Sequence, residues 1–214
     1  MKILQILLVS CVLSGCSVAQ KAQYSALEKF GVHKRDILVD RIEKTTETQE
    51  ETKQQFQSAY EELASLVDVD DQGLEQRYQR MASAVDKSEA KASELTARIS
   101  SVDKVANDLF AEWEEELNQY QSTSLRSASQ NNLNATKARY QKIYQKMQES
   151  SAKVEPVLQV LQDNTLYLKH NLNARAVSGL SNEVLVIEDK VRALIAQMEL
   201  SINESKSFIG SMQN

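Results

Sequence analysis

Residues that form turns are scarce in this chain of 214 residues, which contains one proline and five glycines. Aromatic residues make up only 6% of the sequence, whereas charged residues make up 26%. A β-sheet protein needs turn residues about every ten positions, and this punctuation is missing. The composition therefore argues against a sheet protein and favours long helices of the bundle or coiled-coil type.

Cysteine is equally rare, because Cys11 and Cys16 are the only two and both lie near the N-terminus. If the chain is cut before Cys16, the remainder cannot form an internal disulfide. Cys16 is then better explained as a site of lipid attachment than as half of a bridge.

Residues 1–15 have the composition of a bacterial lipoprotein signal peptide. A basic residue precedes an apolar run over residues 3–13, and two small residues stand directly before Cys16. The run is too short to span a membrane, because eleven helical residues rise only about 16 Å against ~30 Å of hydrocarbon. The pattern predicts export, cleavage before Cys16 and acylation of that cysteine with palmitate-type chains. Cleavage after Ala19, which would release a soluble periplasmic protein, is the alternative.

The position after Cys16 is occupied by Ser17. In Gram-negative lipoproteins an Asp at this position favours retention in the inner membrane, so by analogy we expect the periplasmic face of the outer membrane. Residues 16–23 are the predicted lipidated tether, and residues 24–214 are predicted to form a single elongated helical domain.

The chain carries a formal net charge of −5, and removal of Lys2 with the leader makes the remainder one unit more negative. Such a surface suits a soluble protein domain and argues against nucleic acid as a partner.

The clearest helix prediction covers residues 74–113, where spacings of four and three alternate for nearly six heptads. The predicted seam comprises Leu74, Tyr78, Met81, Val85, Ser88, Ala92, Leu95, Ile99, Val102, Ala106, Leu109 and Trp113.

Comparable apolar stripes fall within residues 38–66, 133–172 and 184–212. Turn residues separate the stripes at residues 68–73, 122–124 and 178–182. Short connections make neighbouring helices antiparallel, so the predicted fold is all-α: an elongated antiparallel three-to-four-helix coiled-coil bundle about 70 Å long. Because the last helix is shorter, we expect four helices in the half next to residues 178–182 and three in the half nearer the lipid.

The middle of this rod is unusual. Residues 44–55 contain no apolar side chain, and antiparallel pairing places them beside residues 86–96 and 150–160, the second of which contains Pro156. One interpretation is a thin, partly polar waist, because proline kinks a helix interior. The other is close helix approach, with Pro156 as the first residue of a new helix.

Reactive groups are few. The only histidines, His33 and His170, are expected roughly 45 Å apart along the rod, so they cannot share a metal or acid–base site. No phosphate-binding loop, no cysteine after Cys16 and no Gly-x-Ser-x-Gly motif is present. We therefore predict no enzymatic activity, no cofactor and no metal site.

Two segments are candidates for adhesion. Polar and basic side chains gather near the far turn, where they either bind a partner or form internal hydrogen bonds: Lys169, His170, Asn171, Asn173 and Arg175. Close to the predicted anchor, a short apolar stripe suits bundle packing, the membrane interface or an unstructured tether: Tyr24, Leu27 and Phe30.

Three stretches resemble one bacterial protein family: GVHKRDILVDR at residues 31–41, LFAEWEEEL at 109–117 and LKHNLNAR at 168–175. The family is domain of unknown function 2959, found mainly in gammaproteobacteria, and the resemblance covers essentially the whole chain after the leader. It has no established activity or catalytic residues, so the resemblance implies no function.

Together these features predict a non-enzymatic lipoprotein of the cell envelope that acts as a helical scaffold, spacer or adaptor for another envelope protein. The alternative is a module that binds along the membrane surface or shapes it, which the negative charge disfavours. An enzyme using the distal Asn, His and Arg residues is the least supported reading. Self-association stays open, because heptad seams can also close between chains.

Overall fold

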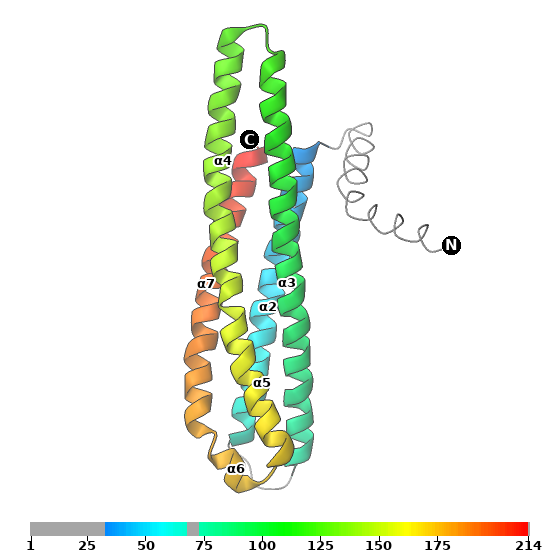
Figure 1. Ribbon diagram of the computed structural model, residues 1–214. Helices are drawn as coiled ribbons and strands as arrows, with labels where there is room; N and C mark the ends of the chain where they lie inside the picture. Colours follow the sequence, from blue (N-terminus) through cyan, green and yellow to red (C-terminus); the bar gives the residue numbers. More distant parts are fainter. Residues whose placement is uncertain (1–32, 68–72, 214) are drawn as a thin grey trace, which may run out of the picture.

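The computed structural model describes residues 33–67 and 73–213 of the chain. Its elements are α2 (Lys34–Val67), α3 (Leu74–Glu116), the 3-10 helix η1 (Leu117–Gln119), α4 (Thr123–Ala152), α5 (Val154–His170), α6 (Ala174–Ser178) and α7 (Ser181–Gln213). They form one long antiparallel bundle (Figure 1). No strand occurs within these two ranges, which confirms the all-α prediction.

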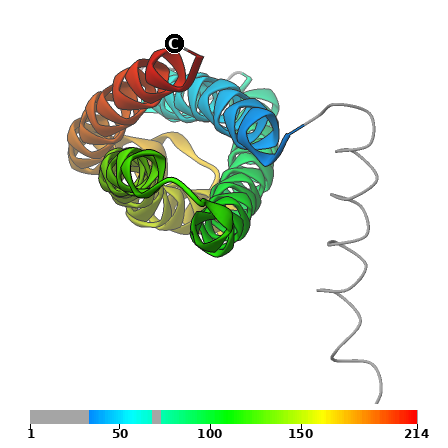
Figure 2. The ribbon, with the colours of Figure 1, turned by 90° about the horizontal axis from the view of Figure 1, so that it is seen from above.

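Helices α2, α3 and α7 and the column formed by α4 and α5 surround a common core (Figure 2). Helix α2 packs against α3 and α7, and α4 with α5 packs against the same two neighbours from the other side. The connection after α3 is fixed by a local cap, since Ser122 Oγ accepts a hydrogen bond from the backbone N–H of Leu125 at 3.4 Å. At the other end, Gly73 takes a φ of +89° before α3, a conformation that favours glycine.

The predicted seam of α3 faces the core. Eight of its twelve positions are buried, and the other four pack against the core while partly exposed: Tyr78, Ala92, Leu109 and Trp113. Ala84, Val105 and Phe110 are buried as well, because α3 contacts neighbours on two sides and needs a wider apolar face than a simple seam.

The distribution of helices along the rod differs from the prediction of a four-helix half and a three-helix half. Helix α7 runs beside α2 along its whole length, and Met212 lines one recess with Asp36 near the start of α2. Lys34 pairs with Glu112 at 2.7 Å, so α3 continues beyond the start of α2. Past that level only α3, η1 and α4 continue, as a two-helix hairpin (Figure 1). The four-helix half next to residues 178–182 is present, whereas the expected three-helix half is not, because α2 begins, in the described residues, only at Lys34 and α7 reaches its level.

A layer of buried polar side chains crosses the middle of the bundle. Gln49 of α2 is fully buried, and its Nε2 donates to Ser150 Oγ of α4 and to Ser201 Oγ of α7, both at 2.8 Å. On the α3 side, Gln55 Nε2 donates to the carbonyl oxygen of Ala84 at 2.9 Å. The polar waist predicted from residues 44–55 is therefore present.

The predicted pairing of the mid-rod segments is confirmed by contacts between helices. Lys91 Nζ of α3 lies 2.6 Å from Glu51 Oε2 of α2, and Gln55 Nε2 lies 3.4 Å from Ser88 Oγ. The buried threonines of α2 satisfy their hydroxyls locally, because each donates to the carbonyl oxygen four residues earlier: Thr45, Thr46, Thr48 and Thr52. The threonine hydroxyls are thus satisfied on burial, whereas Gln49 Oε1 is buried without a hydrogen-bond partner among the described residues.

Pro156 is the third residue of α5, rather than the first residue of a new helix or a kink inside one. Helix α4 ends at Ala152, and the N–H of Lys153 bonds to the carbonyl oxygen of Ser150 at 3.2 Å. Proline is tolerated there because N–H groups in the first turn have no acceptor within the helix. Each of the two interpretations of the mid-rod holds in part: the waist is polar, and the helix restarts.

Gln49→Ala should lower the free energy of unfolding by about 2 to 4 kcal/mol, because it removes two buried hydrogen bonds and leaves a cavity. Urea denaturation followed by circular dichroism measures this loss. Gln54→Ala is the matched control, since Gln54 is exposed on the same helix and should cost less than about 0.5 kcal/mol. Equal losses in the two variants would contradict the role given to the layer.

Candidate functional site

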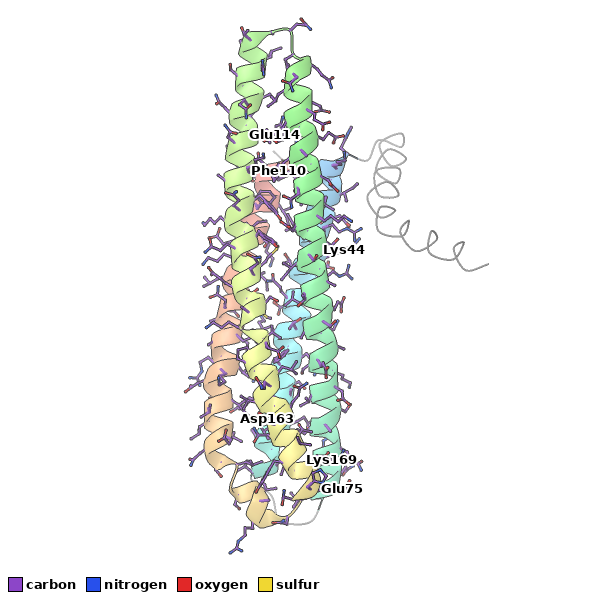
Figure 3. All side chains as sticks on the ribbon, in the orientation of Figure 1. Lys44, Glu75, Phe110, Glu114, Asp163 and Lys169 are labelled. Atoms are coloured by element: carbon purple, nitrogen blue, oxygen red, sulfur yellow. The ribbon has the colours of Figure 1, made fainter. Side chains whose placement is uncertain are left out.

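The five residues of the predicted partner surface lie together at one end of the rod, where α5 passes into α6. All five side chains are exposed: Lys169, His170, Asn171, Asn173 and Arg175. Figure 3 shows Lys169 at this end, the same end as Glu75 in the first turn of α3. The geometry brings the residues together, and partner binding by them stays a prediction.

The two asparagines of this surface build the turn. Asn171 Nδ2 donates to the carbonyl oxygen of Tyr167 at 3.0 Å, and Asn173 Oδ1 accepts from the N–H of Ala176 at 3.0 Å. Asn173 therefore caps α6. These bonds favour the internal interpretation of the asparagines, although they are local and do not cross between helices.

The bases of the surface have a different role. Lys169 and His170 lie in the last turn of α5, where positive charge is stabilised by the helix dipole. Their exposure leaves them available to an acidic partner surface.

Exposed apolar side chains flank the same end, and the sequence patterns singled out neither Leu185 nor Val186 there. Leu166 and Tyr167 on α5 are 59% and 46% exposed, and Leu185 and Val186 near the start of α7 are 61% and 47% exposed. The sequence feature that could have identified these exposed residues is their spacing, because they lie outside the stripes of buried residues such as Leu168 and Ile187. Apolar side chains rimmed by amides and bases resemble the composition of protein interfaces.

The two histidines do not form a site. His33 directly precedes α2 and His170 ends α5, at opposite ends of the four-helix region. Within residues 33–67 and 73–213, no three His, Cys, Asp or Glu side chains are grouped so that they could hold a metal ion. The helices described in these ranges also include none that is long and apolar enough to cross a membrane.

A second recess, of about 430 Å³, lies between α3 and α4 below the hairpin. Tyr140 OH donates to Asp103 Oδ1 at 3.0 Å, and the Tyr140 ring contacts Phe110, Tyr144 and Phe208 with centroid separations of 5.5, 5.8 and 6.4 Å. Burial, followed by the neighbouring Asp103 charge, raises the pKa of Tyr140. The arrangement joins three helices, α3, α4 and α7.

Lys137 of α4 also lines this recess. Its Nζ pairs with Glu114 and lies 5.6 Å from the centre of the Phe110 ring, a cation–π arrangement. Figure 3 shows Phe110 and Glu114 on the same stretch of α3. Through its pair with Lys137, Glu114 links α3 to α4.

The predicted signal peptide, the lipidation site Cys16, the tether over residues 16–23 and the stripe from Tyr24 to Phe30 all lie outside the described residues.

The raised pKa of Tyr140 predicts a dependence of stability on alkaline pH. The folded state favours the neutral phenol, whereas an unfolded tyrosine ionises near pH ~10, so the free energy of unfolding should fall as the pH rises above about 10. Tyr140→Phe should lower the free energy of unfolding by about 1 kcal/mol at pH 8. The difference in free energy of unfolding between the variant and the parent should become smaller above pH ~10. Denaturation at a series of pH values measures the difference in free energy of unfolding between the two proteins. A constant difference up to pH ~11 would contradict the prediction.

Comparison with known proteins gives a family and no activity. No curated protein and no solved structure matches the chain. One family model, described as a protein of unknown function (DUF2959), matches residues 23–212 and so covers every described helix apart from the last residue of α7. The resemblance found in residues 31–41, 109–117 and 168–175 is confirmed, and the chain belongs to the DUF2959 family.

Proposed function

We propose that the protein is a non-enzymatic, lipid-anchored spacer of the bacterial cell envelope. It presents the α6 end of its rod to a partner protein. The observation that carries the proposal is the difference between the two ends. The chain joins the rod at His33, beside the hairpin, whereas the exposed surface with apolar, amide and basic side chains lies at the opposite end.

The anchor is supported by the leader sequence. An apolar run over residues 3–13 followed by small residues and Cys16 is the pattern that bacterial export and lipid attachment require. Ser17 in place of Asp favours the periplasmic face of the outer membrane.

The rod supplies distance. Helix α3 has 43 residues, which corresponds to about 65 Å. Ion pairs connect neighbouring helices of the rod. Lys91 of α3 pairs with Glu51 of α2, and Lys142 Nζ of α4 lies 2.8 Å from Glu204 Oε1 of α7. A spacer needs this stiffness, because a flexible linker of the same residues would not hold a partner at a fixed height.

The alternative, a module that lies along the membrane or shapes it, has one supporting observation. No acidic residue occurs between Glu116 and Glu149, and this stretch carries five basic residues. Three of the five pair with carboxylates of the same chain: Lys137 with Glu114, Lys142 with Glu204 and Lys146 with Glu149. Bases neutralised in this way form a poor basic membrane face, so we favour the spacer.

Cys16→Ser should abolish incorporation of labelled palmitate and move the protein from the membrane fraction to the soluble or uncleaved pools. Fractionation of cells expressing the full chain measures this change. Cys11→Ser is the matched control, because that residue lies inside the predicted leader and should leave both readouts unchanged. If the Cys16→Ser variant still incorporates palmitate, the proposal that lipid on Cys16 anchors the protein is contradicted.

A photoreactive amino acid at Leu185 should form a discrete crosslink to another envelope protein in living cells. The matched control is Leu200, which lies on the same helix, is 54% exposed against 61% for Leu185, and should give no such product. The crosslink should disappear when Lys169→Glu and Arg175→Glu are introduced together. Identical products at both positions, or a product insensitive to the charge reversals, would contradict a specific surface at the α6 end.

A further inference from the structure

The hairpin of α3 and α4 extends beyond the rest of the bundle (Figure 1). Near the base of the hairpin, Lys34 at the start of α2 pairs with Glu112 of α3. Seven further residues lead to the end of η1, which corresponds to about 10 Å of additional length. Residues 117–126, called the hairpin tip below, thus form the end of the described structure nearest to the point where the N-terminal chain joins it.

The hairpin tip presents two apolar side chains to solvent. Tyr120, between η1 and α4, is 43% exposed, and Leu125 in the first turn of α4 is 60% exposed. The turn that carries them is ordered by its own hydrogen bonds, since Ser122 Oγ meets the N–H of Leu125 at 3.4 Å and Ser124 Oγ at 3.0 Å. The tip therefore offers these side chains from a defined surface.

The charge of the hairpin tip is unlike that of the whole protein. The chain has a net charge of −5, yet residues 117–126 contain no carboxylate and a single base, Arg126. Arg126 is exposed and its Nη2 lies 3.4 Å from Asn118 Oδ1. Of the glutamates that precede the tip, Glu112 and Glu114 are paired with Lys34 and Lys137.

We propose that the hairpin tip is a second membrane contact, which rests on the phospholipid leaflet that carries the lipid on Cys16. Leu125 enters the boundary between headgroups and acyl chains, Tyr120 lies at the interface, and Arg126 meets lipid phosphates. This inference rests on the anchor in the proposed function and adds a docking surface and an orientation to it.

The position of the hairpin tip near the predicted anchor favours the bilayer as its binding partner. Sixteen residues separate Cys16 from His33, a length that spans at most ~55 Å. The hairpin tip is the end of the described structure nearest to His33, where the chain that leads from Cys16 joins the bundle. One tyrosine and one leucine bind a bilayer weakly alone, and the tether makes the contact effective by raising its local concentration.

The opposite end supplies a matched control. Leu166 and Tyr167 near α6 are 59% and 46% exposed, almost the same as Leu125 and Tyr120. If exposed apolar side chains contacted lipid regardless of position, both pairs would do so.

The test attaches the full chain, carrying Cys11→Ser, through the Cys16 thiol to a maleimide lipid in vesicles of phosphatidylethanolamine and phosphatidylglycerol. A photoreactive amino acid replaces either Leu125 or Leu166, and mass spectrometry measures phospholipid adducts. We expect adducts at position 125 and none above background at position 166. Absence of adducts at 125, or equal yields at both positions, would overturn the proposal. Because the attachment is chemical, the result does not depend on lipidation in the cell, which the Cys16→Ser experiment tests separately.

A second arm keeps the probe off the proposed contact residues, at the exposed Ser127. Tyr120→Ser with Leu125→Ser should lower the adduct yield at 127 by about tenfold, since it removes the apolar burial. Leu166→Ser with Tyr167→Ser should leave that yield unchanged. Circular dichroism of both double variants checks that the bundle is intact, and equal yields from the two would also overturn the proposal.

Discussion

The hydrogen bonds of Gln49 hold three helices of the rod at one register, and the positions of both ends depend on that register. A seam of apolar residues alone tolerates a shift of one heptad, about 10 Å, with modest loss of packing. Gln49 removes this freedom, because a shifted α4 or α7 would leave its buried amide without the hydroxyls of Ser150 and Ser201. A polar group in the seam thus specifies alignment while the apolar residues supply stability.

The alignment has consequences at each end. With α7 set against α2, Met212 lies beside the start of α2, and Phe208 is buried against Tyr140 of α4. The longer α3 and α4 then have no third helix to contact in the described structure, and they project as a hairpin. At the other end, the same alignment leaves α5, α6 and the start of α7 to form a cap whose outer side chains are exposed. One layer in the middle therefore helps to determine which side chains are exposed at each end of the rod.

Sequence periodicity predicted the inner face of the rod and much of its alignment. The α3 seam, the antiparallel order and the pairing of residues 44–55 with residues 86–96 follow from spacing alone, because each side chain's burial there depends on neighbours within two turns. The participation of Ser201 could not be foreseen, since Gln49 could have donated to any small hydroxyl on α7 at that level.

The ends of the rod were predictable only in part. The exposed fraction of Leu166 or Leu185 depends on how far a neighbouring helix extends, although both residues lie outside the apolar stripes that face the core. The amides of Asn171 and Asn173 depend in the same way on where α5 stops, because the break creates the N–H and carbonyl groups that they bind. Composition therefore singled out a group of residues that lie together at one end of the rod, while their division into turn-building and exposed groups required the structure.

An upright rod that separates a membrane from a partner is the central claim. Neutron reflectometry of the lipid-anchored protein on a supported bilayer measures the height of the protein layer. The account predicts a layer of about 70 Å, the length of α3 with its turns. A layer of about 25 Å, the width of two packed helices with their side chains, would show that the protein lies along the membrane and would contradict the account.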